Sequence, residues 1–111
     1  MRGITNIGDK MKLVKLCGVN EIEDGSVRGF DIEGKHIILV KQNGKFFSLD
    51  GICTHAHADM ADGFLSDGSI TCSLHLSVFD LKTGNPTNPP ARLPLKTYKV
   101  KVEGGNVFVE L

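Results

Sequence analysis

The chain has 111 residues, 41% of them hydrophobic, and its 13 basic and 13 acidic residues give a formal net charge of zero. That length suits one domain with one modest core and leaves no room for a second, and the charge balance excludes a general attraction to nucleic acid or to a membrane surface. The longest aliphatic run, residues 37–40, is far shorter than the roughly 20 residues of a membrane-spanning helix. We therefore expect a single domain over residues 1–111, with no nucleic-acid or membrane partner.

Short runs that are rich in Val, Ile and Phe, or that alternate polar and apolar residues, predict β-strands along most of the chain. In chain order, these runs are 12–17, 27–33, 36–42, 45–49, 69–72, 77–81, 98–104 and 106–111. Glycine-containing turns separate several of them and predict antiparallel hairpins, at residues 33–35, 43–44, 82–84 and 104–105.

Two segments differ from this strand pattern. Residues 18–25 have room for a helical turn, and residues 85–94 hold all four prolines, which predicts a stiff extended loop outside any sheet interior. The fold class expected from the whole pattern is all-β, an antiparallel β-sandwich or small barrel.

The start of the chain, MRGITNIGDKMKLVKLC, has neither the apolar stretch nor the small-residue cleavage site of a secretory signal. The whole chain has three cysteines. This odd and small number favours metal or redox chemistry in a reducing compartment over a framework of disulfides. We expect a cytoplasmic monomer in which the polar residues 1–10 form a loose tail ahead of the first strand.

Residues 51–80 contain two of the three cysteines, three of the four histidines and no Lys or Arg. Cys53 and His55 follow the predicted strand 45–49, whereas Cys72 and His75 lie at the junction of the two predicted strands around them. Each of two hairpin ends therefore offers one thiol and one imidazole. The full pattern is C-x-H, sixteen residues, then C-x-x-H.

Two simpler chemistries use the same residue types. One structural zinc ion could take a Cys₂His₂ set, although zinc fingers usually keep the cysteines in one half of the motif and the histidines in the other. Thiol–imidazole catalysis would use one Cys–His pair and an orienting group, and would leave the second pair without a purpose.

In residue type, order and spacing the pattern resembles the Rieske [2Fe–2S] motif, and residues 12 to 111 are similar to Rieske-type ferredoxins of bacterial oxygenase systems. The resemblance implies a Rieske fold, with a cluster-binding lobe built from hairpin loops over about residues 46–92. It implies one [2Fe–2S] cluster, with Cys53 and Cys72 on the buried iron and His55 and His75 on the outer iron. Two neutral imidazoles in place of thiolates make the site less negative, which raises the reduction potential to about −150 to +300 mV from about −400 mV.

The resemblance also bears on residues around these four ligands. Ser77 stands where high-potential Rieske proteins have a serine that hydrogen-bonds a cluster sulfur, and Phe79 stands where they have a tyrosine. Ala58 and Leu74 occupy the positions of their extra disulfide, so that bridge is absent, which favours a soluble ferredoxin.

Further residues are expected to shape or surround the site. His57 could serve docking or proton-linked chemistry beside the cluster, and Gly51, Gly63 and Gly84 are expected as turn glycines that shape the loops. The docking surface expected around the ligand histidines comprises Leu74, Leu76, and Pro89 and Pro90 of a lid. By contrast, we expect Cys17 to be a buried apolar thiol and His36 a partly exposed structural residue.

The function implied is that of a one-electron carrier without a catalytic site of its own. It would accept electrons from an NAD(P)H-dependent reductase and pass them, by transient docking, to a terminal oxygenase that hydroxylates aromatic rings. An alternative is the Rieske small subunit of a larger reductase such as assimilatory nitrite reductase, and a third interpretation is a zinc-containing interaction module.

Charge is distributed unevenly along the chain. Residues 46–81 contain five acidic residues and no basic one, whereas the remainder holds all 13 basic residues and eight acidic ones. We therefore predict a dipole whose negative end is the cluster-binding lobe, and partners with basic rims that increase the association rate.

Overall fold

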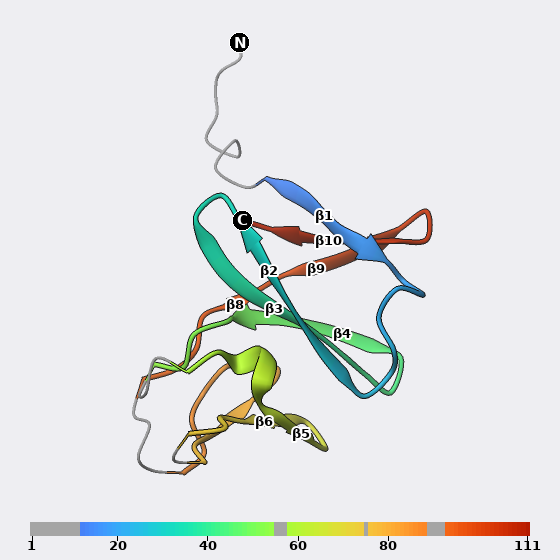
Figure 1. Cartoon of the computed structure of the whole chain (residues 1–111). Coiled ribbons are helices and arrows are strands. Elements are labelled where there is room, and N and C mark those ends of the chain that lie inside the picture. Colours follow the sequence, from blue (N-terminus) through green and yellow to red (C-terminus); the bar gives the residue numbers. More distant parts are fainter. Residues whose placement is uncertain (1–11, 55–57, 75, 89–92) are drawn as a thin grey trace.

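The computed structural model describes residues 12–54, 58–74, 76–88 and 93–111, and within these ranges the chain is all-β (Figure 1). The strands pair in three antiparallel sheets, with the orders β1-β10-β9, β2-β3-β4-β8 and β5-β6-β7. Their bounds are β1 Leu13–Gly18, β2 Ser26–Ile32, β3 Lys35–Gln42, β4 Lys45–Asp50, β5 Phe64–Ser66, β6 Ser69–Thr71, β7 Val78–Asp80, β8 Thr97–Tyr98, β9 Val100–Glu103 and β10 Asn106–Glu110. A 3₁₀ turn, η2 (Met60–Asp62), precedes β5.

Three of the four predicted hairpin turns join paired strands, and their φ values explain why. The fourth, at residues 82–84, follows β7 and leads to an isolated bridge between Phe79 and Pro86, and no second strand forms there within the described residues. The β2–β3, β3–β4 and β9–β10 hairpins each have a two-residue turn, and both turn residues have positive φ: Glu33-Gly34, Asn43-Gly44 and Gly104-Gly105. This is the turn geometry whose twist matches paired antiparallel strands, and glycine and asparagine adopt it at low cost.

The structure differs from the prediction at three places. Residues 18–25, where a helical turn had room, contain no helix: Gly18 ends β1 and turns follow it, for example through the Glu21 N–H to Gly18 carbonyl bond of 3.0 Å. The short strand β5 and the 3₁₀ turn η2 were not predicted. The predicted strand 98–104 is two strands: Tyr98 of β8 pairs with β4, and Val100 of β9 pairs with β10.

This change of sheet between β8 and β9 joins the two basal sheets, β1-β10-β9 and β2-β3-β4-β8. At the junction the Tyr98 hydroxyl donates a 2.6 Å hydrogen bond to Asp50 Oδ1, at the end of β4. Burial and this bond to a carboxylate raise the pKa of Tyr98 far above its usual value, so the hydroxyl stays a donor throughout the physiological range.

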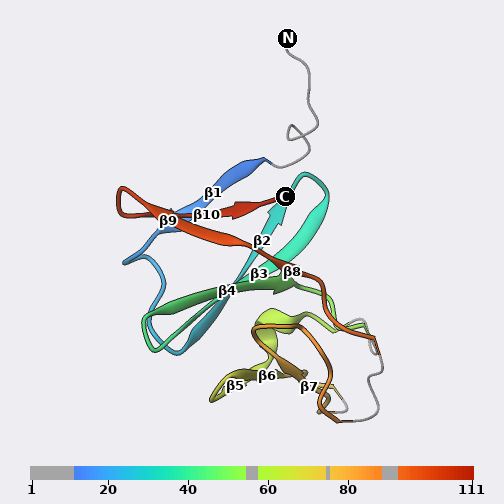
Figure 2. The same ribbon diagram turned by 180° about the vertical axis from the view of Figure 1, so that it is seen from behind.

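The sheets stack in three layers, with β2-β3-β4-β8 in the middle and the small sheet β5-β6-β7 below it with η2 (Figures 1 and 2). We call the lower layer, from Gly51 to Asn88, the lobe. Ile38 and Val40 of β3 pack with Met60, Ile70 and Phe79 of the lobe. Leu39 and Ile37 instead pack with Val107 and Val109 of β10, respectively. Within the described ranges, no helix is long and apolar enough to span a membrane.

The close approach of the turn after β7 to the segment before β8 can be tested by replacing Gly84. Gly84 has a φ of 77°, its carbonyl accepts a 2.8 Å bond from the Leu95 N–H, and an added Cβ would overlap the Leu95 carbonyl. Gly25 has a similar φ of 81° with nothing within 4 Å of an added Cβ, so Gly25→Ala is a matched control. We expect Gly25→Ala to lower the free energy of unfolding by about 1–2 kcal/mol and Gly84→Ala by about 1–3 kcal/mol more. Urea unfolding followed by circular dichroism measures both, and equal losses would contradict the close approach.

Candidate metal centre

Two predicted ligands, Cys53 and Cys72, lie together in the core where the lobe packs against the middle sheet. Cys53 follows β4 and Cys72 follows β6, and their exposed fractions are 1% and 0%. Both belong to the hydrophobic cluster that contains Met60, Ile70 and Phe79. Both are free thiols, so they are available as ligands.

The two cysteines occupy loops of the same design. The Cys53 N–H donates to the Ala58 carbonyl at 2.8 Å, and the Cys72 N–H donates to the Ser77 carbonyl, also at 2.8 Å. In each loop the acceptor is five residues after the cysteine, so each loop returns to its own cysteine over the same length of chain. His55 and His75 themselves, like His57, Pro89 and Pro90, lie outside the described residues.

The electrostatics of the thiol pair favour a bound metal. Burial raises the pKa of the Cys72 thiol, the Leu74 N–H that donates to its sulfur acts in the opposite direction, and the adjacent Cys53 thiol raises it further. Two buried thiolates side by side are costly unless a cation compensates their charge. Within the described ranges no group of three or more His, Cys, Asp or Glu residues forms a metal site, so these thiols would need ligands from the undescribed parts of the loops. The donors present fit an iron–sulfur cluster that takes its other ligands there.

The second cysteine loop contains a strained residue next to a buried serine. Leu76 has a φ of 56°, and its side chain is 58% exposed. Ser77 is fully buried and participates in an interaction with its surroundings. A non-glycine residue in the left-handed region costs about 1–2 kcal/mol, and here it reverses the chain so that the Ser77 carbonyl reaches Cys72.

A third segment, after β7, ties both cysteine loops together. Asn88 Oδ1 accepts a 2.7 Å bond from the Val78 N–H, and its Nδ2 donates to the Leu76 carbonyl at 3.4 Å. From the first loop, the Thr54 hydroxyl donates to the Leu93 carbonyl at 2.8 Å. These bonds bring Asn88 and Leu93 beside the cysteine loops, whereas the predicted lid residues Pro89 and Pro90 are not described.

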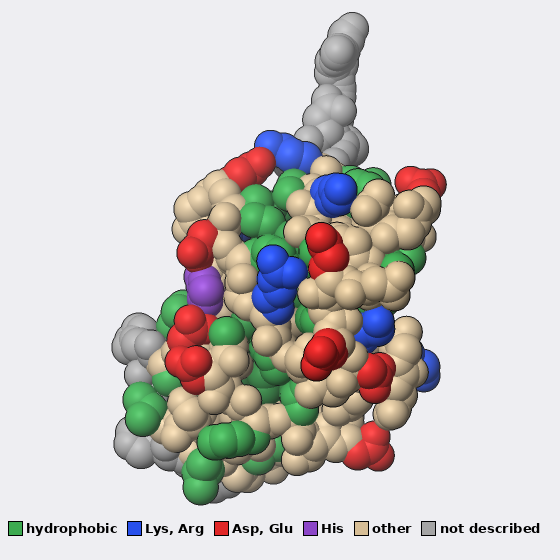
Figure 3. Space-filling view, turned by 45° about the vertical axis from the view of Figure 1, so that its right-hand side comes forward, with side chains coloured by type: hydrophobic (Ala, Val, Ile, Leu, Met, Phe, Trp, Pro, Cys, Tyr) green, Lys and Arg blue, Asp and Glu red, His purple; other side chains and the backbone are tan. Residues whose placement is uncertain are grey.

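Large apolar side chains are exposed on the lobe and on the segment beside it, and Figure 3 shows hydrophobic side chains gathered at this end of the molecule. The exposed ones are Ile52, Phe64, Leu74, Leu76 and Leu93. Leu74 and Leu76 were predicted to contribute to a docking surface. Ile52, Phe64 and Leu93 were not predicted, because an isolated apolar residue in a loop gives no sign of whether it is buried.

Other predictions from single residues can now be compared with the structure. Cys17 is buried in a separate hydrophobic cluster, away from the thiol pair, as predicted. Gly63 has a φ of −78°, and an added Cβ would lie 2.6 Å from the Thr71 carbonyl. Its role in the loop is therefore to leave room for backbone, and positive φ is not required.

His36 is partly exposed, as predicted, but its contacts were not predicted. Its side chain is 23% exposed, and its two ring nitrogens lie 2.6 Å from Asp31 Oδ1 and 2.9 Å from Asp59 Oδ1. Asp59 Oδ1 also accepts from the Ala61 N–H at 2.9 Å and caps η2. An aspartate just before a short helical turn commonly caps that turn. This preference is the one feature of the sequence that could have indicated a structural role for Asp59.

Comparisons with known proteins agree with this geometry. Residues 12–99 match the Rieske [2Fe-2S] domain family. The ferredoxin component of the naphthalene 1,2-dioxygenase system of Pseudomonas aeruginosa is 39% identical over 100 residues, which are 90% of this chain and 96% of that protein. The ferredoxin component of the p-cumate 2,3-dioxygenase system of Pseudomonas putida is 34% identical over 113 residues, 100% of this chain and 96% of that protein. A chain in the solved complex of reduced oxygenase and oxidized ferredoxin in carbazole 1,9a-dioxygenase superposes with a TM-score of 0.84 and 28% identity, over 87% of this chain and 91% of that one.

The chain therefore belongs to the Rieske [2Fe–2S] domain family. It carries one [2Fe–2S] cluster, and it is an electron-transfer protein of the ferredoxin type with no catalytic site of its own. The predicted all-β Rieske fold, cofactor and class of function are confirmed.

Proposed function

We propose that this protein carries single electrons in the cytoplasm, from an NAD(P)H-dependent reductase to a terminal oxygenase that hydroxylates aromatic rings. The observation that carries the proposal is the pair of buried, free thiols of Cys53 and Cys72 at the ends of two matching loops, beside an exposed apolar surface. The names of the relatives support it, because they are ferredoxin components of dioxygenase systems, and the ferredoxin of carbazole 1,9a-dioxygenase has been solved together with its oxygenase.

We propose Cys53, His55, Cys72 and His75 as the cluster ligands. The bound cluster supplies reversible one-electron redox chemistry. The chain contributes two thiols from the buried side, where Met60, Ile70 and Phe79 exclude water. The exposed loops would contribute the two imidazoles, so that the side of the site nearest a partner is made by histidine.

Docking in this proposal uses the exposed apolar side chains around the loops. Leu74 and Leu76 are 50% and 58% exposed, and Leu93 is 65% exposed. The lid predicted from Pro89 and Pro90, and a docking or proton-linked role for His57, belong to the same proposed surface. Such an interface should be small and transient, which suits a carrier that must leave each partner after one electron.

Three of the five acidic residues among residues 46–81 bond to other parts of the structure, which narrows the choice of docking residues. Asp50 accepts from Tyr98, Asp59 binds His36, and Asp80 accepts two bonds from Thr83. Asp62 is exposed at the end of η2, and its carboxylate makes no hydrogen bond or ion pair with the described residues. Asp67, before the Gly68 turn, is exposed in the same way, so Asp62 and Asp67 are the acidic residues best suited to interact with a basic partner.

A transient carrier and a permanent subunit of a larger enzyme differ in their oligomeric state. The 12.0 kDa chain, a single domain, should elute as a monomer and should be reduced by a reductase added in trans. Stable co-elution with a larger reductase would instead support the nitrite-reductase type of assembly.

The three buried cysteines offer a matched test of the ligands. We expect Cys53→Ala and Cys72→Ala to lose the red-brown colour, the two irons and the two acid-labile sulfides, because each removes a thiolate ligand. Cys17→Ala removes a similarly buried thiol from a separate group of packed hydrophobic side chains. This variant should keep the full iron and sulfide content. Metal and sulfide analysis of the purified proteins measures this. Stoichiometric zinc in wild type from iron-replete cells would contradict the cofactor, and retention of iron by Cys72→Ala would contradict its role as a ligand.

Ser77 should tune the reduction potential if its hydroxyl donates to a cluster sulfur. A hydrogen bond to a charged acceptor contributes about 1.5–3 kcal/mol, and about 1.4 kcal/mol corresponds to roughly 59 mV for one electron. Because only the difference between the two redox states counts, we expect Ser77→Ala to lower the potential by several tens of millivolts. Ser69→Ala in β6, outside the cysteine loops, is the control. A potential for Ser77→Ala within error of wild type in spectroelectrochemical titration would exclude this role.

Electrostatic steering should make electron transfer to the oxygenase sensitive to salt. We expect the second-order rate constant, measured by stopped flow, to fall severalfold as salt rises from about 20 to 300 mM, where the Debye length shrinks from roughly 20 Å to about 6 Å. Asp62→Asn should weaken this dependence. Glu23→Gln, an exposed acidic residue outside the lobe, should leave it nearly unchanged. A rate that is flat in salt, or that rises with it, would refute steering.

A further inference from the structure

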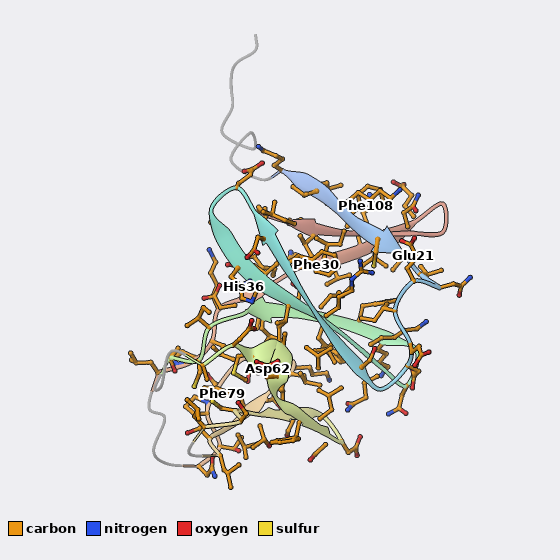
Figure 4. The ribbon with its side chains drawn as sticks, viewed as in Figure 1. Glu21, Phe30, His36, Asp62, Phe79 and Phe108 are labelled. Atoms are coloured by element: carbon orange, nitrogen blue, oxygen red, sulfur yellow. The ribbon has the colours of Figure 1, made fainter. Side chains whose placement is uncertain are left out.

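His36, at the start of β3, lies in a slot formed by two glycines. A Cβ added at Gly29 of β2 would lie 3.2 Å from His36 Cε1, and one added at Gly51 would overlap His36 Cδ2. Figure 4 shows His36 at the edge of the middle sheet, above the turn that carries Asp62. The slot fixes the His36 ring between β2 and the first cysteine loop.

Both ring nitrogens of His36 meet carboxylates. Nδ1 lies 2.6 Å from Asp31 Oδ1 in β2, and Nε2 lies 2.9 Å from Asp59 Oδ1 at the start of η2. A neutral imidazole has one N–H donor, whereas the imidazolium has two. Both contacts are therefore hydrogen bonds only when the ring is protonated. We call these three residues the His36 bridge.

The His36 bridge is attached to both ends of the first cysteine loop. At the incoming end, the Gly51 N–H donates to the His36 carbonyl at 2.8 Å. At the outgoing end, Asp59 pairs with Ile52 in an isolated β-bridge and follows Ala58, whose carbonyl accepts from Cys53. The Met60 N–H then donates to the Gly51 carbonyl at 2.7 Å and closes the loop.

We propose that His36 is a positioning residue for the first cysteine loop, and that its imidazolium form holds this loop against β3. When the ring loses a proton, one carboxylate faces a lone pair and one hydrogen bond of the bridge is lost. The loop that carries Cys53 then opens more often. The His36 bridge thus makes the retention of the cluster depend on pH, an inference that rests on the proposed ligand role of Cys53.

The direction of the pH effect follows from the two carboxylates. Hydrogen bonds to Asp59 and then to Asp31 raise the pKa of His36, against the effect of burial. Among the residues that the structure describes, Asp31 and Asp59 are the charged groups that face the ring from β2 and from the lobe, and Gly29 and Gly51 bring no side chain. A raised folded-state pKa means that the stabilisation is complete below the unfolded value of about 6.5 and is lost as pH rises through the folded value.

Hydrogen–deuterium exchange of the cluster-loaded protein tests the bridge directly. We expect the protection of the peptide covering residues 51–60, relative to the unfolded chain, to fall about tenfold as pH rises through the His36 pKa, equivalent to about 1.4 kcal/mol. His36→Gln should show the low protection at all pH values. Asp31→Asn removes an 85% exposed carboxylate, so it should lower the pKa of His36 and move the loss of protection to lower pH.

The opposite end of β3 provides a matched control. Gln42 Nε2 donates to the Ser66 carbonyl at 2.7 Å, and Gln42 Oε1 accepts from the Gly68 N–H at 2.8 Å. Gln42→Ala should therefore lower protection in residues 64–71 and leave residues 51–60 unchanged, whereas His36→Gln should do the reverse. A pH midpoint that does not move in Asp31→Asn, or unchanged protection of residues 51–60 in His36→Gln, would overturn the proposal.

The rate at which excess chelator bleaches the visible absorbance separates this proposal from the ligand assignment. Faster bleaching of His36→Gln than of Gln42→Ala supports both the role of the His36 bridge and the assignment of Cys53 as a ligand. If protection of residues 51–60 falls without faster bleaching, the His36 bridge positions the loop but the loop does not control the cluster, and the claim about cluster retention is overturned.

Discussion

The burial of β3 on both faces is the constraint on which the rest of the structure depends. Ile37, Ile38, Leu39 and Val40 are all fully buried, with alternate side chains on opposite faces of the middle sheet. Each such side chain contributes about 1.5–3 kcal/mol relative to an exposed one, provided that both neighbouring layers are present. The upper sheet and the lobe are therefore held in place by one continuous strand, and the core that surrounds the thiol pair is part of the same packing.

Polar contacts at the two ends of β3 complement this apolar packing. His36 reaches Asp59 beside the first cysteine loop, and Gln42 reaches the hairpin between β5 and β6. Apolar packing is not directional, whereas these hydrogen bonds have defined partners. The strand that supplies most of the burial therefore also sets the position of the lobe on the sheet.

The candidate metal centre has one buried side and one exposed side. Cys53 and Cys72 lie in a dry core, where a change of charge is felt strongly because the dielectric response is weak. Leu74, Leu76 and Leu93 remain exposed beside the same loops, where a partner can cover them. An electron carrier requires both properties, since its redox site must be shielded from water and must still lie close to the partner's surface.

What the sequence determined by itself was local. The turns Glu33-Gly34 and Asn43-Gly44 could be predicted because their φ values depend on the residues themselves, and the cysteine–histidine pattern indicated the family because its spacing lies within two loops. Tertiary structure decided the features that depend on distant partners. The division of 98–104 into β8 and β9 follows from which sheet each half meets, and Asp59 meets His36 across 23 positions of sequence. Whether a polar group is bonded or exposed is set by such long-range contacts, and periodicity and spacing carry no information about them.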